Sequence, residues 1–235
     1  MSLIFRPLFE KFSSTYTYLL ADFESKEAII IDAVQETKQR DIGLIEELGL
    51  TLKYIIETHV HADHITSSCP LKERFSDAKI VLGEANSVAC ADILIKEGDI
   101  LAFGKYKVMA MSTPGHTDGC MSYVVDGKVF TGDALLIRSC GRCDFQGGSA
   151  DKLFDSIQSL FALPDEAAVY PAHDYGGRTV SSIWEEKAFN EMIGGGVDKA
   201  EFVSRVNAMN LSLPAKIHVA VPANQVCGAN IISDG

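Results

Sequence analysis

Residues 58–64 read THVHADH and place three of the six histidines of the chain beside an aspartate within seven positions. Imidazole nitrogens and carboxylate oxygens are common protein ligands for zinc and non-haem iron. A single histidine on an apolar strand is more often a core residue than a ligand, but the spacing His-x-His-x-Asp-His favours a metal site. Side chains at alternate positions of a strand end point the same way, so His59 and His61 can converge, while Asp63 and His64 face a neighbouring point.

Three further motifs carry the same ligand types: TPGHTDG (113–119), GDA (132–134) and PAHDYGG (171–177). They add His116, Asp133 and His173, which brings the set to seven potential ligands, enough for two adjacent ions. Each motif follows a short run that is typical of a buried strand. Functional groups are often found where such a strand emerges into a loop, so we expect the motifs to meet at one metal centre.

The elements that must position these motifs are short apolar, β-branched runs closed by Gly, Pro or Asp. The runs predicted as strands are YTYLLADF, AIIIDA, KYIIET, KIVLG, KVMAMS, YVVDGKVFTG and AAVYPA. Asp126-Gly127 predicts a two-residue hairpin turn. Helices are expected over 37–48, after Ser149 and after Asp198. This mixture predicts an α/β protein with much antiparallel pairing.

The composition excludes several classes of function. A length of 235 residues with 47% hydrophobic residues allows a substantial core, and a net charge of −11 argues against nucleic acid or an anionic membrane as a partner. No apolar run approaches the roughly 20 residues that span a bilayer, and the first residues do not resemble a signal peptide. The cysteines are too scattered for a disulfide scaffold, so a reduced, cytoplasmic bacterial setting is expected, although a processed mitochondrial form also fits. A homodimer is expected because dimers are the commonest assembly.

The four motifs, in this order, resemble those of the metallo-β-lactamase superfamily. The resemblance covers residues from about 15 to 180 and implies a four-layer αβ/βα sandwich, with the metal at the edge between two β-sheets. Two more segments, TGDALLIRSCGRCDFQGGS (131–149) and the stretch from EFVSRV to VPANQVCGAN (201–230), resemble the persulfide dioxygenases. With them the resemblance spans nearly the whole chain, so residues 1–235 are expected to form a single domain, with an extension of about 195–235 packed on it.

The persulfide dioxygenase resemblance implies one Fe(II) per chain, held by His59, His116 and Asp133. Two histidines and one carboxylate leave about three positions of an octahedral ion open, which suits an enzyme that binds both O2 and substrate. The implied reaction oxidises glutathione persulfide with O2 and water to sulfite and glutathione. The other four ligand-type residues would then orient the iron ligands and bound waters without binding the metal: His61, Asp63, His64 and His173.

Glutathione carries two carboxylates, so its site needs a cationic group. Arg142 in the CGRCDF loop is the first candidate, with Tyr175 as a hydrogen-bond partner, although Arg142 could instead stabilise its loop through an ion pair and Tyr175 could serve packing. Cys143 stands where the resemblance leads us to expect Thr, and with Cys140 it forms a CxxC that we interpret as two incidental loop thiols. Cys227 could approach the active site.

Two alternatives remain open. All seven ligands of a binuclear zinc hydroxyacylglutathione hydrolase of the glyoxalase II kind are present, and such an enzyme would activate a bridging hydroxide against a thioester. However, the C-terminal part lacks the length and basic character of the helical glutathione-binding domain expected there. A non-catalytic metal- or thiol-binding module is the third class. Metal content and an oxygen electrode would separate all three.

Overall fold

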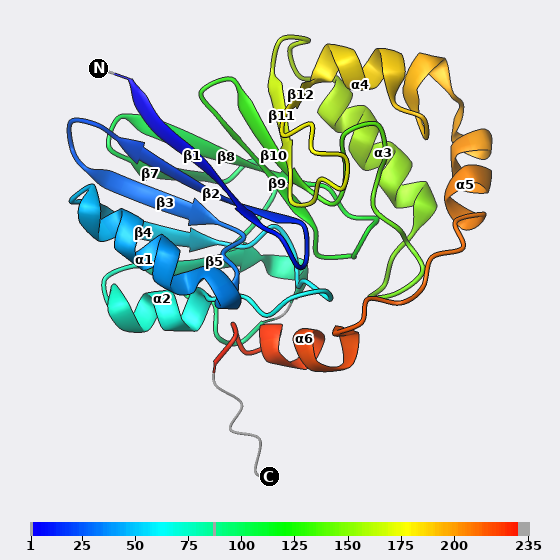
Figure 1. Ribbon diagram of the computed structural model, residues 1–235. Helices are drawn as coiled ribbons and strands as arrows, with labels where there is room; N and C mark the ends of the chain where they lie inside the picture. Colours follow the sequence, from blue (N-terminus) through cyan, green and yellow to red (C-terminus); the bar gives the residue numbers. More distant parts are fainter. Residues whose placement is uncertain (1, 87, 230–235) are drawn as a thin grey trace.

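The computed structural model describes residues 2–86 and 88–229. Two six-stranded mixed sheets pack face to face, with helices on their outer faces (Figure 1). The first sheet contains, in spatial order, β1 (Leu3–Glu10), β2 (Thr15–Asp22), β3 (Glu27–Ile31), β4 (Thr51–Ile56), β5 (Lys79–Gly83) and β6 (Ile93–Ile95). The second contains β12 (Ser181–Ser182), β11 (Ala168–Pro171), β10 (Lys128–Gly132), β9 (Met121–Val125), β8 (Tyr106–Ser112) and β7 (Ile100–Phe103). The predicted four-layer α/β sandwich is confirmed.

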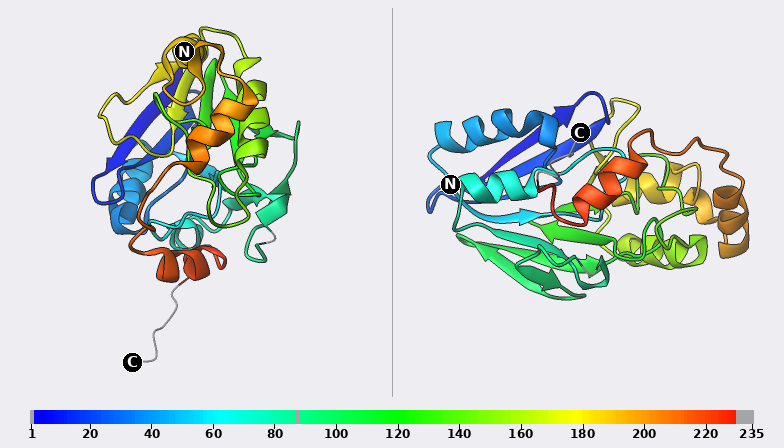
Figure 2. Two further views of the ribbon diagram at one scale, coloured as in Figure 1. Left: turned by 90° about the vertical axis from the view of Figure 1, so that its right-hand side faces the viewer. Right: turned by 90° about the horizontal axis from the view of Figure 1, so that it is seen from below.

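The helices cover the sheets from outside. Their bounds are α1 (Lys38–Glu47), α2 (Ser68–Arg74), α3 (Ala150–Phe161), α4 (Ile183–Phe189), α5 (Lys199–Asn207) and α6 (Ile217–Asn224). Figure 2, seen from below, places α1 and α2 on the side of the first sheet. Helix α3 packs on the outer face of the second sheet and contacts α5. None of the described helices is long and apolar enough to cross a membrane.

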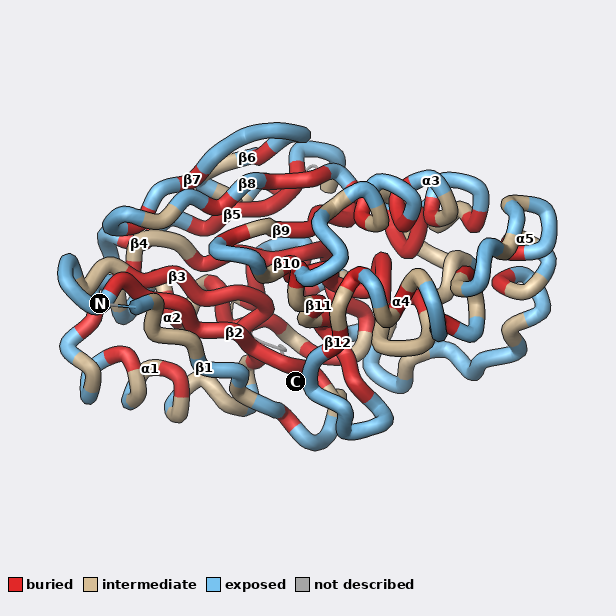
Figure 3. Tube along the Cα trace, turned by 90° about the horizontal axis from the view of Figure 1, so that it is seen from above, coloured by how far each residue is buried: buried red, intermediate tan, exposed pale blue. Residues whose placement is uncertain are grey.

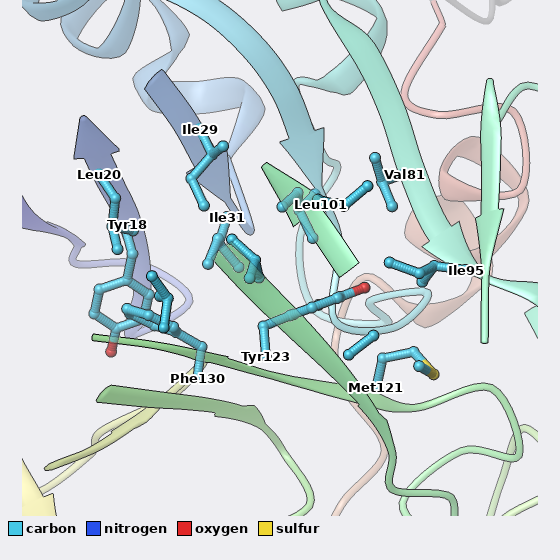
Figure 4. Packing of buried hydrophobic residues seen from close by; sticks show 14 of the residues in the cluster. Tyr18, Leu20, Ile29, Ile31, Val81, Ile95, Leu101, Met121, Tyr123 and Phe130 are labelled. Carbon is cyan, nitrogen blue, oxygen red and sulfur yellow. The ribbon is translucent and has the colours of Figure 1, made fainter. Parts of the chain in front are cut away.

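Strands β2 and β3 are buried on both faces because both faces of the first sheet are covered there. Tyr18 and Ile31 of the first sheet point between the sheets, where they meet Tyr123 and Phe130 of the second (Figure 4). The alternate residues of β2 and β3 point outward, and Leu19 belongs to the core beneath the helices on that side. Figure 3 shows the result, with buried strand interiors and exposed outer turns of the helices.

The predicted local signals are found where the sequence places them. The helix expected over 37–48 is α1, and the Ser149 and Asp198 side chains each cap a helix by accepting a hydrogen bond from the backbone N–H three residues on. Asp126 and Gly127 adopt φ of 51° and 72°, as a type I′ hairpin turn requires. The turn at Asp126 and Gly127 joins the antiparallel strands β9 and β10 of the second sheet.

Edge strand β1 was not predicted. Its sequence, LIFRPLFE, contains Arg6 and Pro7, and most of its residues are half-buried or exposed. Proline is tolerated at a sheet edge because an edge strand can leave an N–H position unpaired. The short strands β6, β7 and β12 were also missed.

Each polar motif lies where a strand ends: β4 ends two positions before the first motif, β8 ends directly before the second, and β10 and β11 end on the first residue of the third and the fourth. Strand β4 ends at Ile56, β8 at Ser112, β10 at Gly132 and β11 at Pro171. The loops that follow carry the potential ligands. The strand ends of the two sheets therefore determine where these loops begin.

Candidate metal centre

Three buried side chains from three different loops form a compact ligand set. His59 follows β4, His116 lies between β8 and β9, and Asp133 follows β10 directly. One ligand atom from each lies within 4.8 Å of the others. This is the triad that the resemblance to the persulfide dioxygenases implied, and the fold brings it together.

The remaining polar atom of each triad residue is already held by a neighbour. The His59 Nδ1 lies 3.0 Å from the Thr58 hydroxyl, which itself donates to Asp32. The His116 Nδ1 lies 2.7 Å from the backbone carbonyl oxygen of Arg142. A ring nitrogen held in this way fixes the tautomer and leaves Nε2 for the metal.

Asp133 is oriented by the same principle. Its Oδ1 accepts a hydrogen bond of 2.7 Å from the Nδ1 of His173, while its Oδ2 lies 3.7 Å from the His116 Nε2. The atoms left facing one another are therefore two imidazole nitrogens and one carboxylate oxygen. That donor set fits a divalent cation such as Fe(II).

Glycine allows the loops to approach closely at the triad. A Cβ atom on Gly141 would lie 2.3 Å from the carbonyl oxygen of Asp133 and 2.9 Å from the His116 ring. A Cβ atom on Gly132, which has φ of +54°, would lie 2.8 Å from the Thr58 side chain. Both positions therefore exclude larger residues beside the ligands.

The other four predicted residues form a second set. Ligand atoms of His61, Asp63, His64 and His173 also lie within 4.8 Å of one another. The Asp63 Oδ2 lies 3.0 Å from the His173 Nε2 and 3.1 Å from the His64 Nδ1. This second set touches the triad through His173, whose other ring nitrogen donates to Asp133.

His61 lies beside His59, with the ring centroids 4.0 Å apart, and also contacts two carboxylates. Its Nε2 lies 3.2 Å from Asp32 and 3.6 Å from Glu57, and these three residues form a further buried set. Burial alone would lower the pKa of His61, but Asp32 and Glu57 outweigh it and raise that pKa to about 9. His61 is thus engaged with carboxylates behind the site.

The protonation states of the triad suit a metal. Burial lowers the pKa of His59 well below its usual value and also lowers that of His116, so both imidazoles are neutral. Burial opposes ionisation of Asp133 too, but the adjacent His173 outweighs it and holds the Asp133 pKa below its usual range. Burial also opposes a charge on His173, yet Asp133 and Asp63 raise its pKa well above normal. Neutral imidazoles and a carboxylate bind a cation without first releasing protons.

The triad opens into the main cavity of the described part of the chain, with a volume of about 710 Å³. Both predicted substrate residues, Arg142 and Tyr175, lie in its wall. Tyr175 is 76% exposed, and its ring is parallel to that of His173 with the centroids 6.0 Å apart. The cavity is large enough for a tripeptide thiol beside the metal.

The Arg142 guanidinium is occupied by protein partners. It forms two hydrogen bonds of 2.6 Å to the Asp144 carboxylate and donates to the backbone carbonyls of Leu211 and Ser212. The loop-stabilising ion pair considered from the sequence is therefore present. Because Arg142 also offers its own carbonyl to His116, it links the C-terminal wall of the cavity to a triad ligand.

Comparisons with known proteins point to the same family as the sequence motifs. The metallo-β-lactamase superfamily model matches residues 11–173. The mitochondrial persulfide dioxygenase ETHE1 of Bos taurus is 46% identical over 228 residues, which cover 96% of this chain and 89% of the relative. The crystal structure of ETHE1 from Myxococcus xanthus has a TM-score of 0.93 at 48% identity and covers 96% of this chain and 99% of that one. The hydroxyacylglutathione hydrolase of Brucella ovis is 41% identical over 217 residues, which cover 90% of this chain and 81% of the relative.

The chain belongs to the metallo-β-lactamase superfamily and, within it, to the persulfide dioxygenase family. The superfamily match ends at His173, so α4, α5 and α6 lie beyond it. The segment between α5 and α6 nevertheless forms part of the wall of the cavity. Residues 209, 211, 212 and 214 line the cavity.

Asn224 at the end of α6 is a contributor to the site that the sequence did not reveal. Its side-chain amide donates hydrogen bonds of 2.8 Å to the carbonyls of His61 and His64 and accepts one of 2.9 Å from the Thr66 backbone. The segment VPANQVCG indicated the family, but no local pattern predicts which distant loop an Asn side chain will bind. Asn224 thus fixes the loop that follows β4 from behind.

The expectation that every cysteine is reduced is wrong for one pair. Cys90 and Cys227 form a disulfide across 137 residues of sequence. Cys227 lies with His59, His61 and Asn224 around a small space behind the ligand loop, so it does approach the site, but on the side away from the main cavity. Cys140 and Cys143 are free thiols, and burial raises the pKa of Cys143 to about 12. Such a thiol is a poor nucleophile, in line with the interpretation of this CxxC as incidental.

Proposed function

We propose that this protein is an Fe(II)-dependent persulfide dioxygenase that oxidises glutathione persulfide with O2 and water to glutathione and sulfite. The observation that carries the proposal is the separation of the ligands into two sets. His59, His116 and Asp133 bring two imidazoles and one carboxylate together, which is the donor set of a 2-His-1-carboxylate iron site. His61 contacts Asp32 and Glu57 through its Nε2, and its Nδ1 lies 4.0 Å from Asp63 of the second set. The similarity to two proteins named ETHE1, one of them also named a persulfide dioxygenase, supports the same reaction.

The reaction balances without a further reductant. Glutathione persulfide, O2 and water give glutathione, sulfite and two protons, because the outer sulfur loses four electrons and O2 gains four. Iron held by His59, His116 and Asp133 would supply open positions for O2 and for the thiolate sulfur of the substrate. The protein must then bind the glutathione part of the substrate, keep the iron ligands in position and accept the protons that the reaction releases.

The residues around the triad suit these tasks. His173 donates to Asp133 and holds the free carboxylate oxygen toward the metal position. The other ring nitrogen of His173, Nε2, lies 3.0 Å from Asp63 Oδ2 and 3.1 Å from the Thr15 hydroxyl, so these groups can hold a proton at that nitrogen. His61 and His64 complete the shell behind Asp63. Tyr175 would contact the substrate, and its exposed ring beside that of His173 supports this role.

A binuclear zinc hydroxyacylglutathione hydrolase is the second candidate. It is favoured by the second set of His61, Asp63, His64 and His173, which offers enough ligands for another ion, and by the similarity to the Brucella ovis enzyme. In that case both sets would hold zinc, and a hydroxide between them would attack a thioester.

An oxygen electrode decides between the candidates. Purified protein loaded anaerobically with Fe(II) is mixed with glutathione persulfide, and sulfite is measured in parallel. Equal amounts of O2 consumed and sulfite formed support the proposal. Cleavage of S-lactoylglutathione by the zinc-loaded protein, without persulfide-dependent O2 uptake, would overturn it in favour of the hydrolase. Metal binding with neither activity would show a non-catalytic module.

A further inference from the structure

Three arginines line the cavity, and two of them are fully engaged by the protein. Arg138 binds the carboxylates of Glu185 and Glu186 and the Ser181 hydroxyl. Arg142 binds Asp144 and the two carbonyls of the C-terminal wall. Neither guanidinium is left for an anionic substrate.

Arg178 is the third arginine, and its situation is different. Within residues 2–86 and 88–229, its guanidinium forms no hydrogen bond or ion pair, and it is exposed in the cavity wall. Arg178 acts electrostatically on Glu185, whose carboxylate is already bound by Arg138 and Ser181. Arg178 therefore offers a free positive charge at the cavity.

The loop that carries Arg178 is held firmly although its side chain is free. Asp174 accepts hydrogen bonds from the backbone N–H groups of Gly176, at 2.9 Å, and Thr179, at 2.8 Å. These bonds enclose the segment between them, and the segment starts beside His173 of the metal centre. A charge on a fixed loop loses less conformational entropy when it binds a ligand.

Glu191 supplies an opposite charge in the lining of the same cavity. Its backbone N–H donates to the carbonyl of Arg138 at 3.2 Å, and its own carbonyl accepts from Arg205 at 2.7 Å. Its carboxylate has no partner in the described structure and lines the cavity. Arg178 and Glu191 are both connected to the Arg138 region, the first through Glu185 and the second through the backbone.

We propose that Arg178 and Glu191 together bind the α-amino-acid end of the γ-glutamyl group of the thiol substrate, Arg178 its carboxylate and Glu191 its ammonium group. This assignment rests on the proposed function. A free cation and a free anion that line one cavity match a zwitterion, whereas the glycyl end of glutathione carries a carboxylate alone. Charge-assisted hydrogen bonds of this kind select for the group that satisfies both charges. Arg178 and Glu191 are thus specificity residues, and Arg142 serves the cavity wall.

The test measures binding of glutathione to the iron-loaded protein by anaerobic titration calorimetry. Arg178→Gln and Glu191→Gln remove one charge each, and Arg6→Gln and Glu47→Gln are matched controls because both residues are exposed and lie outside the cavity. We expect the dissociation constant to rise about tenfold in each cavity variant and to stay within about twofold of wild type in the controls.

Truncated thiols identify the end that is bound. γ-Glutamylcysteine keeps the zwitterion, so Arg178→Gln should weaken its binding as much as that of glutathione. Cysteinylglycine lacks the γ-glutamyl group and should bind both cavity variants as it binds wild type. Wild type should discriminate against N-acetylglutathione, which has no ammonium group, and Glu191→Gln should lose that discrimination.

Each negative result would overturn a different claim. Glutathione binding that is unchanged in both cavity variants, in an enzyme that still oxidises glutathione persulfide, overturns the assignment alone. Equal weakening of cysteinylglycine and glutathione by Arg178→Gln would place Arg178 at the glycyl carboxylate and also overturn it. A wild-type protein that neither binds glutathione nor oxidises its persulfide overturns the proposed function itself.

Discussion

Asn224→Ala should destabilise the protein although it lies outside the metal ligands and the main cavity. The side chain is buried, with 3% of its surface exposed, and joins α6 to three backbone groups of the ligand loop. Alanine removes all three hydrogen bonds and leaves the carbonyls of His61 and His64 and the N–H of Thr66 without that partner.

The size of the effect follows from these contacts. A hydrogen bond between neutral groups contributes about 1 kcal/mol net, so three of them predict a loss of about 3 kcal/mol in the free energy of unfolding. The loss acts on the loop that holds His59, so weaker iron binding should accompany it.

Urea unfolding of the metal-free protein, followed by circular dichroism, measures the first effect, and iron retained after gel filtration measures the second. Asn207→Ala is the matched control, since Asn207 is exposed at the end of α5. A loss below about 1 kcal/mol relative to this control, with iron fully retained, would refute the idea that α6 fixes the ligand loop.

Three other substitutions test the site and its surroundings. Asp133→Ala should abolish iron retention because it removes the only carboxylate of the triad, whereas His64→Ala should slow persulfide oxidation and keep much of the iron; equal iron loss in the two variants, by metal analysis, would disprove this division of roles. Gly141→Ala should cost about 1–3 kcal/mol in unfolding free energy by overpacking, and should reduce iron binding, because its methyl group would lie 2.3 Å from the Asp133 carbonyl oxygen; wild-type iron affinity would contradict that contact. Cys90→Ser opens a disulfide that spans 137 residues, which on the chain-entropy model predicts a loss of up to about 5 kcal/mol; a thermal midpoint equal to that of the oxidised wild type would contradict a stabilising role.

The sequence predicted the triad because each ligand lies beside a strand end that local patterns reveal. The strand run AIII of AIIIDA is apolar without a break, since both faces of β3 are buried, and it could be recognised without knowing the fold. The ligands His59, His116 and Asp133 follow such runs, so they converge once the strands are assembled into the two packed sheets. That inference also drew on the resemblance to a known family.

Contacts across the chain could not be predicted in the same way. The partner of Arg142 could be a substrate or Asp144, and nothing in the local pattern decides between them; the structure shows that Asp144 and two distant carbonyls occupy it. The disulfide between Cys90 and Cys227 depends on where α6 packs against the rest of the protein. The hydrogen bonds of Asn224 to the ligand loop depend on the same packing. Such contacts are tertiary, and a weakly amphipathic segment such as 217–224 carries no periodic signal for them.

The free charges of the cavity were overlooked for a related reason. Arg178 and Glu191 stand in polar surface segments where charged residues are ordinary, and only the structure shows that both face the cavity without partners in the described residues. Sequence reasoning selected Arg142 because it lies in a recognisable motif.

Anomalous diffraction from crystals of the anaerobically purified protein, recorded at the iron and zinc absorption edges, tests the central claim most directly. The account predicts one iron peak per chain, coordinated by His59, His116 and Asp133, and no peak among His61, Asp63, His64 and His173. Two peaks per chain with a zinc signal, one in each ligand set, would contradict it and favour the binuclear hydrolase.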